Sequence, residues 1–171
     1  MKAALSLGIC LLAFVLPASS AAKIEVAHDP EVDFSRFSTY AWIEGSPAGK
    51  PEVQIWLVKA IEHELESKGL RKVDPDSADV HVKSLVLTLV NVSIFSNYIG
   101  SATGGWGFWQ ANTRAYGDGA LVVDIIDPDV DKLVWRSIAS GTITGAWQKA
   151  ERKLPKITGK MFKDFPPYFV P

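Results

Sequence analysis

Three histidines are the first candidates for chemistry, because nucleophilic catalysis needs a nucleophile, a base and a group that orients the base. His63 lies between two glutamates in a helical pattern, on the side that we expect to be solvated. His81 alternates with valines in a strand pattern, and His28 ends another strand. The sequence has no Gly-x-Ser-x-Gly motif and no pair of histidines at metal-ligand spacing. We therefore expect no catalytic residue, no metal site and no cofactor.

Three aspartates in the segment DPDVD, Asp127, Asp129 and Asp131, resemble the start of a calcium-binding loop. Such a loop requires glycine at its sixth position and glutamate at its twelfth. Lys132 and Ile138 occupy those two positions. Because Asp-Pro and neighbouring aspartates are ordinary turn formers, the segment predicts a turn between two strands rather than a calcium site.

The segment 100–113, GSATGGWGFWQANT, is rich in glycine and could cradle a phosphate. A phosphate-binding loop would require GxxxxGK[ST], or GxGxxG before a helix. The residue directly after Gly107 is phenylalanine rather than the lysine of the first motif. Two interpretations remain. Either the aromatic side chains fold back on the core, or Trp106, Phe108 and Trp109 form a partly exposed contact surface. Because ordering the glycines is entropically costly, we expect a mobile loop joining two strands, with at least one of Trp106 and Trp109 exposed.

The N-terminus has the pattern of a secretory signal peptide. Met1-Lys2 is followed by the apolar run AALSLGICLLAFVL, by a proline and by the small residues ASSAA. The run is shorter than the roughly 20 apolar residues of a membrane-spanning helix. We expect residues 1–22 to be removed, and residues 23–171 to form an exported protein in the periplasm or at the periphery of the outer membrane.

Cleavage at this position would remove the single cysteine, Cys10, and with it any disulfide or thiol chemistry. A lipid-acceptor cysteine follows a small residue and a complete apolar region, whereas Ile9 precedes Cys10 and LLAFVL follows it. We therefore expect no lipid anchor. The formal net charge is −1, so the global excess of Lys and Arg that nucleic-acid binding requires is missing.

The remaining chain alternates between strand and helix patterns. Apolar residues recur every four positions from Val53 to Leu65, after Pro51 and before Lys68-Gly69, which predicts a helix. Strand patterns occupy residues 23–28, 38–43, 79–95, 119–127 and 132–144.

A second helix is predicted from about residue 149 to residue 165, with Leu154, Met161 and Phe165 on one side. The basic residues lie mostly on the other side: Lys149, Arg152, Lys153, Lys156, Lys160 and Lys163. A solvated outer face is the commoner explanation of such a pattern, and we expect it here. Binding to anionic lipid is the alternative.

The order of these elements predicts an α+β fold, with a single domain, a mainly antiparallel sheet of about five strands and two helices packed on one face. In the hairpin formed by 119–127 and 132–144, alternation places Leu121, Val123, Ile125, Leu133 and Trp135 toward the core. Asp124 and Arg136 then share the opposite face. We expect a contact between them that is structural rather than catalytic.

Several of these segments occur together in one known family. FSRFSTYAW (34–42), DVHV (79–82), GALVVDIIDPDVDKLVWR (119–136) and FPP (165–167) follow one another, and the chain resembles domain-of-unknown-function family 4136. The resemblance implies an exported protein of the bacterial envelope. Many relatives look like lipoproteins, a pattern from which this sequence departs. The family carries no assigned activity, so the resemblance implies a fold and a compartment only.

These patterns favour a non-catalytic domain of the bacterial cell envelope that binds a partner protein, an envelope surface or an apolar ligand. A hydrolase of an unrecognised type and a purely structural envelope protein are the alternatives. Turnover of an ester, phosphate or glycoside substrate by the purified protein would favour the hydrolase.

Overall fold

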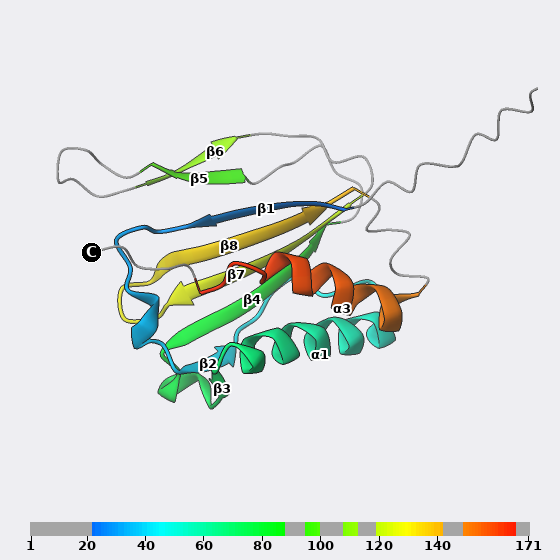
Figure 1. Ribbon diagram of the computed structural model, residues 1–171, viewed down its shortest axis with the longest axis horizontal. Coiled ribbons are helices and arrows are strands. Elements are labelled where there is room, and N and C mark those ends of the chain that lie inside the picture. Colours follow the sequence, from blue (N-terminus) through cyan, green and yellow to red (C-terminus); the bar gives the residue numbers. More distant parts are fainter. Residues whose placement is uncertain (1–21, 88–94, 100–107, 113–118, 142–148, 167–171) are drawn as a thin grey trace, which may run out of the picture.

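The computed structural model describes residues 22–87, 95–99, 108–112, 119–141 and 149–166, and for 95–99 and 108–112 it describes the backbone alone. The predicted signal peptide, residues 1–22, therefore lies outside the described residues except for Ala22. Within these limits the chain forms a six-stranded mixed sheet, with two helices packed together on one of its faces, and a separate two-stranded sheet (Figure 1). The predicted α+β fold is confirmed.

The sheet has six strands in the order β1-β8-β7-β4-β2-β3. Their bounds are β1 Lys23–His28, β2 Thr39–Trp42, β3 Arg71–Lys72, β4 Val80–Leu87, β7 Ala120–Asp127 and β8 Lys132–Ser140. The pairs β1–β8, β8–β7 and β7–β4 are antiparallel, whereas β2 is parallel to both β4 and β3. The sheet is thus mostly antiparallel, as predicted, with a short parallel part at one edge.

The direction of the strands fixes where the two helices begin. Since β4 is parallel to β2 and antiparallel to β7, which is itself antiparallel to β8, the strands β2 and β8 run in the same direction. Helix α1 (Pro51–Ser67) follows β2, and helix α3 (Ala150–Met161) follows β8. Both helices therefore begin at the same end of the sheet and run back along it side by side (Figure 1).

Helix α1 has residues that favour a helix start and a helix end, and an apolar stripe between them. Pro51 occupies the first turn, where its missing N–H is not needed, and Gly69 takes the left-handed conformation (φ +91°) that ends the helix. The apolar stripe from Val53 to Leu65 is buried against the sheet. The short 3₁₀ helices η1 (Phe34–Arg36) and η2 (Pro75–Ser77) connect the other elements.

The main core lies between the helices and the sheet. Trp135 of β8 is fully buried, and its ring centroid lies 4.9 Å from that of Phe162 and 5.1 Å from that of Phe165. Leu154 and Met161 of α3 are also fully buried here. The other face of the sheet carries a smaller apolar cluster of Ala120, Val122 and Ile138, with Leu85 and Leu87 packed against it.

Asp79, just before β4, is hydrogen-bonded to the residues at the start of β2. Its carboxylate accepts from the backbone N–H groups of Ser38 and Thr39 at 2.9 Å each, and from Ser38 Oγ at 3.0 Å. In return, the N–H of Asp79 donates to Thr39 Oγ1 at 2.9 Å. The bonds from Ser38 and Thr39 lower the pKa of Asp79 to about 2, because they stabilise its ionised form.

One prediction about the elements was wrong, and another can be followed only in part. The strand expected over 79–95 is β4 as far as Leu87, residues 88–94 lie outside the described residues, and Phe95 begins strand β5 (Phe95–Ile99), which belongs to a different sheet. The loop expected over 100–113 contains strand β6 (Phe108–Asn112), which pairs antiparallel with β5 in a two-stranded sheet of its own (Figure 1). Since residues 108–112 contain no glycine and two β-forming aromatic residues, this part of the segment can extend.

The boundaries of the last strand and the last helix lie closer to the predicted ones. The described part of β8 ends at Ser140 rather than at residue 144, and α3 covers 150–161 within the predicted 149–165. In the part of the chain that the structure describes, no helix is both long and apolar enough to cross a membrane.

Candidate functional site

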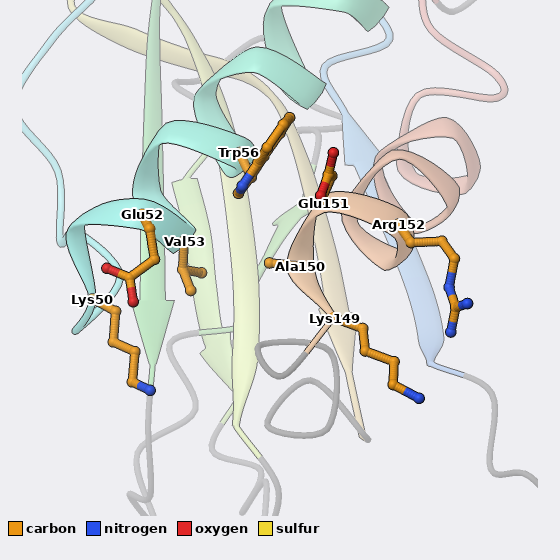
Figure 2. A pocket seen from close by; sticks show the side chains of 8 residues that line it. All are labelled: Lys50, Glu52, Val53, Trp56, Lys149, Ala150, Glu151 and Arg152. Carbon is orange, nitrogen blue, oxygen red and sulfur yellow. The ribbon is translucent and has the colours of Figure 1, made fainter.

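The starts of α1 and α3 enclose an open groove of about 600 Å³ at one end of the domain (Figure 2). The residues that line it come from the first turn or two of each helix: Lys50, Glu52, Val53, Trp56, Lys149, Ala150, Glu151 and Arg152. The two halves of the groove are thus about a hundred residues apart in the sequence. They meet because β2 and β8 deliver the chain to the same end of the sheet.

The floor of the groove is apolar. Val53 and Ala150 belong to the main core and are 4% and 6% exposed. Trp56 is half-buried beside them, and Lys59 Nζ lies 5.1 Å from its ring centroid, within the range of a cation–π interaction. An apolar group entering the groove would therefore meet an indole and the edge of the core.

The rim of the groove is charged and repeats one pattern at both helices. A lysine occupies the N-cap position, Lys50 in α1 and Lys149 in α3, and a glutamate follows two residues later. Neither lysine caps its helix with a side-chain hydrogen bond, and both are exposed. N-cap positions favour Ser, Thr, Asp or Asn, whose oxygen accepts from a free backbone N–H. Lysine provides no such acceptor and adds positive charge at the positive end of the helix dipole.

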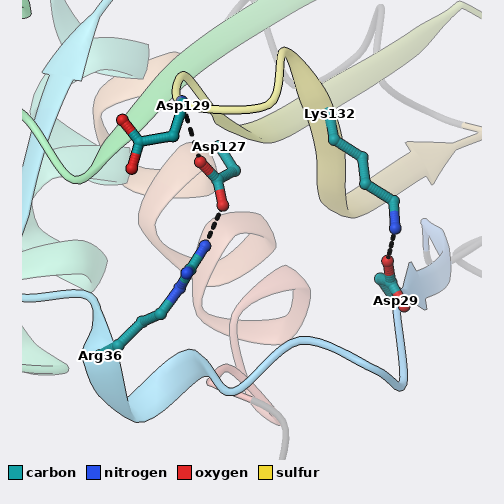
Figure 3. A network of polar contacts seen from close by, with 5 residues as sticks. All are labelled: Asp29, Arg36, Asp127, Asp129 and Lys132. Atoms are coloured by element: carbon teal, nitrogen blue, oxygen red, sulfur yellow. Dashed lines mark hydrogen bonds and ion pairs between the residues drawn. The ribbon is translucent and has the colours of Figure 1, made fainter.

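The opposite end of the sheet contains a second group of charged residues, and these are closed pairs (Figure 3). Asp29 and Asp127 are 0% and 2% exposed. Asp29 pairs with Lys132 and accepts from the N–H of Glu31 at 2.9 Å. Asp127 pairs with Arg36 and accepts from the N–H of Asp129 at 3.0 Å. Each buried carboxylate therefore has a cation and a backbone donor.

The segment that contains Asp127, Asp129 and Asp131 is the turn between β7 and β8, as predicted. Asp131 takes a left-handed conformation (φ 46°), which aspartate tolerates better than most residues. One carboxylate oxygen of Asp127 contacts Arg36, and the other accepts from the backbone N–H of Asp129 (Figure 3). Among the residues described, no cluster of three or more His, Cys, Asp or Glu side chains could hold a metal ion.

The contact expected between Asp124 and Arg136 is formed. The two residues are direct partners across β7 and β8, and Arg136 Nε and Nη2 donate to the two carboxylate oxygens at 2.6 and 2.7 Å. Both residues are buried, on the sheet face that bears the small apolar cluster. This bidentate geometry is that of a structural ion pair.

The three histidines are on three different elements and have different surroundings. His28 is exposed at the end of β1, with its ring 6.2 Å from that of Phe34, and His63 is exposed on α1. His81 Nε2 lies 3.1 Å from the carbonyl oxygen of Pro75. None of the three lines the groove.

The proposed aromatic contact surface is placed only in part. Phe108 and Trp109 belong to β6, where their backbones pair with Ile99 and Tyr98. Their side chains, and Trp106 entirely, lie outside the described residues. The contact surface therefore stays a prediction. The groove was missed by sequence reasoning, although the repeated Lys-x-Glu at both helix starts could have indicated it.

The comparisons with known proteins show the family. The model of the family described as "Domain of unknown function (DUF4136)" matches residues 24–167, and the chain belongs to this family. No curated protein matches the sequence significantly.

Among solved structures, a PDZ domain protein from Parabacteroides distasonis aligns with a TM-score of 0.53 and 16% identity. The alignment covers 88% of this chain but 37% of that one, and the likeness shows the fold alone. Two structures of a PelC dodecamer from Paraburkholderia phytofirmans align with TM-scores of 0.46 and 0.44, at 12% and 10% identity. Each covers 82% of this chain and 96% of PelC.

Proposed function

We propose that this DUF4136 domain is a non-catalytic binding domain of the bacterial cell envelope, and that the groove between the starts of α1 and α3 holds a segment of a partner protein. The observation that carries the proposal is the composition of the groove. It combines a buried apolar floor, a half-buried tryptophan and a rim of exposed charges in about 600 Å³. Tryptophan and arginine are enriched among the residues that dominate binding energy at protein interfaces.

The chemistry of the groove indicates the kind of segment that fits. Three cations, Lys50, Lys149 and Arg152, outnumber the two carboxylates, Glu52 and Glu151. A peptide segment with one large apolar side chain over Trp56 and an acidic residue beside it would match both the floor and the rim. A purely apolar ligand would leave this charge excess without a counterpart.

Four carboxylates that are held by contacts elsewhere in the described chain support binding over catalysis. A general acid or base must reach the reacting group in a cavity. Asp29, Asp124 and Asp127 are buried and are each engaged by a cation, and Asp79 is engaged by backbone donors. These groups serve the fold in the positions that the structure gives them.

The N-terminal pattern supports export of the domain. A basic start, an apolar run and a small-residue segment over residues 1–22 are the three parts of a signal peptide. Intact-mass measurement on the protein from the periplasmic fraction tests this part: we expect a chain that begins between Ala21 and Lys23 and carries no lipid. A lipid-bearing product that begins at Cys10 would contradict it.

Site-specific photocrosslinking in intact cells tests the groove. A photoreactive residue at position 56 should capture a partner, whereas the same residue at position 55 should not, because Ile55 is 54% exposed on the outer side of α1. Once the partner is identified, Trp56→Ala should weaken its binding by about 30-fold or more, the loss of at least about 2 kcal/mol typical of a hot spot. Ile55→Ala should change the affinity by less than about threefold.

Two results would contradict the proposed function. Equal capture from positions 55 and 56 would show that the groove is not the binding site. Turnover of an ester, phosphate or glycoside substrate that is lost in a variant of one described residue would favour the hydrolase alternative.

A further inference from the structure

The outer side of α3 carries a row of basic residues that extends beyond the groove, since only the first of them, Arg152, also lines it. Arg152, Lys156, Lys160 and Lys163 follow one another at spacings of four, four and three residues, which places them on one side of the helix and of the turn after it. All four are exposed. We call these four residues the basic row.

The basic row is not balanced by acidic neighbours. Solvated helix faces usually alternate charges of opposite sign, which pair at spacings of three or four residues. Within the described chain no member of the basic row makes an ion pair, whereas Lys72 pairs with Glu62 of α1 at 2.6 Å. Residues 149–164 contain six Lys or Arg and two acidic residues, Glu151 and Asp164, in a chain whose formal net charge is −1. Positive charge is therefore concentrated on this surface.

We propose that the basic row docks the domain on an anionic lipid surface. The row lies along a convex rod about 17 Å long, at 1.5 Å per residue, and fits a plane better than an enclosed ligand. Three of its four members are lysines, which are strongly hydrated point charges on flexible stems and suit attraction to many headgroups rather than bidentate recognition of one group.

Docking through this row does not require insertion into the membrane. The apolar side of α3 is already buried in the core, where Leu154 and Met161 are 0% exposed. Only charge attraction remains, so binding should be reversible and sensitive to salt. Each Lys or Arg near an anionic surface contributes about 1 kcal/mol, which corresponds to about fivefold in the partition coefficient.

Vesicle co-sedimentation of the purified protein tests this inference. We expect binding to phosphatidylcholine vesicles that contain phosphatidylglycerol, and loss of that binding when the salt is raised from about 0.05 M to about 0.5 M. The pair Lys156→Gln and Lys160→Gln should lower the partition coefficient about 30-fold, and Lys156→Arg with Lys160→Arg should keep it. The pair Lys68→Gln and Arg71→Gln makes the same change of net charge just after the C-terminal end of α1, outside the basic row. It should lower the partition coefficient by less than about threefold.

Several outcomes would overturn the inference: no binding to anionic vesicles, equal loss in the two glutamine pairs, or salt-independent binding to pure phosphatidylcholine. Thermal unfolding of each variant shows whether it is folded, and Lys156→Gln with Lys163→Gln is a second pair for the same test, in which neither residue lines the groove. Because Lys156 and Lys160 do not line the groove, their variants leave the photocrosslink from position 56 intact if only the lipid inference fails.

Discussion

Charged side chains are arranged in opposite ways at the two ends of the six-stranded sheet. At the end with the β7–β8 turn, Asp29 and Asp127 are buried, and each has a cation and a backbone N–H as partners. At the other end, Lys50 and Lys149 begin the two helices without a cap and face solvent. A buried carboxylate is costly unless it is paired, whereas an exposed ammonium is not. The charges at the first end are therefore satisfied by the domain's own contacts, and the second end is the one at which we propose that a partner binds.

The largest effect is expected where a closed pair is most deeply buried. Arg136→Met would leave the Asp124 carboxylate, which is 1% exposed, without its bidentate partner. Removing one member of a buried pair costs about 3–5 kcal/mol, so we expect this loss in the free energy of unfolding measured with denaturant. The double variant Asp124→Leu and Arg136→Met should recover most of it, because no unpaired charge remains. A loss below about 1 kcal/mol for the single variant would show that the pair is not needed by the fold.

The second prediction compares the substitution of two aspartates in the turn between β7 and β8. Asp127 is 2% exposed and holds both Arg36 and the N–H of Asp129, whereas Asp129 is exposed. Asp127→Ala should lower the free energy of unfolding by about 1–3 kcal/mol, because the N–H of Asp129 and the guanidinium of Arg36 both lose their acceptor. Asp129→Ala should change it by less than about 0.5 kcal/mol. Similar losses in the two variants would indicate that the closed pairs add little beyond ordinary turn chemistry.

A third, smaller effect depends on pH. The hydrogen bonds from Ser38 and Thr39 lower the pKa of Asp79 from 3.8 to about 2, so its contribution to stability is present above pH 4. As the pH falls from about 4 to about 2, the carboxylate is protonated and this contribution is lost. Asp79→Asn should therefore cost roughly 1–2 kcal/mol at pH 7, a reduced value because the side chain is partly exposed, and much less at pH 2. Thermal unfolding across this range checks it, and an unchanged difference at both pH values would be contrary to expectation.

The fold and the Asp124–Arg136 pair could largely be predicted from the sequence, because they depend on local patterns, whereas the pairs Asp29–Lys132 and Asp127–Arg36 join segments far apart in the chain and were not predicted. Strand alternation alone places Asp124 and Arg136 on one face, and the four-residue period from Val53 to Leu65 alone gives α1. The second sheet, to which β5 belongs, could not be predicted in the same way. The residues from Leu85 to Phe95 are nearly all apolar or β-branched, and such a run does not reveal that the strand beginning at Phe95 belongs to a different sheet from β4.

The groove could not be predicted for a different reason, which is topological. Its halves begin at Lys50 and Lys149, and they meet only because β2 and β8 are parallel within a mostly antiparallel sheet. The parallel pairing of β2 with β4 leaves no local pattern that a reading of one segment would detect. The Lys-x-Glu segment at one helix start does not by itself indicate a binding site. The groove becomes recognisable only when the starts of both helices are compared.

The smallest effect is a gain in stability, and it concerns the end of the sheet at which the two helices begin. Lys50 has the extended conformation of an N-cap residue (φ −125°, ψ 127°) but no side-chain acceptor. Lys50→Asp would provide an acceptor for a free N–H of the first turn and a negative charge at the positive end of α1. We expect the free energy of unfolding to rise by about 0.5–1 kcal/mol, with a matching rise in thermal stability.

The same substitution should weaken binding in the groove, because it removes one of the three cations of the rim. A variant that is more stable but binds the crosslinked partner less well is the result expected when a binding site is maintained at the expense of stability. Lys68→Asp, at the far end of the same helix, is the control: it places negative charge at the negative end of the dipole and should lower stability without changing binding. If Lys50→Asp gains stability and leaves binding unchanged, the uncapped start of α1 has no part in recognition, and the difference between the two ends of the sheet is one of burial alone.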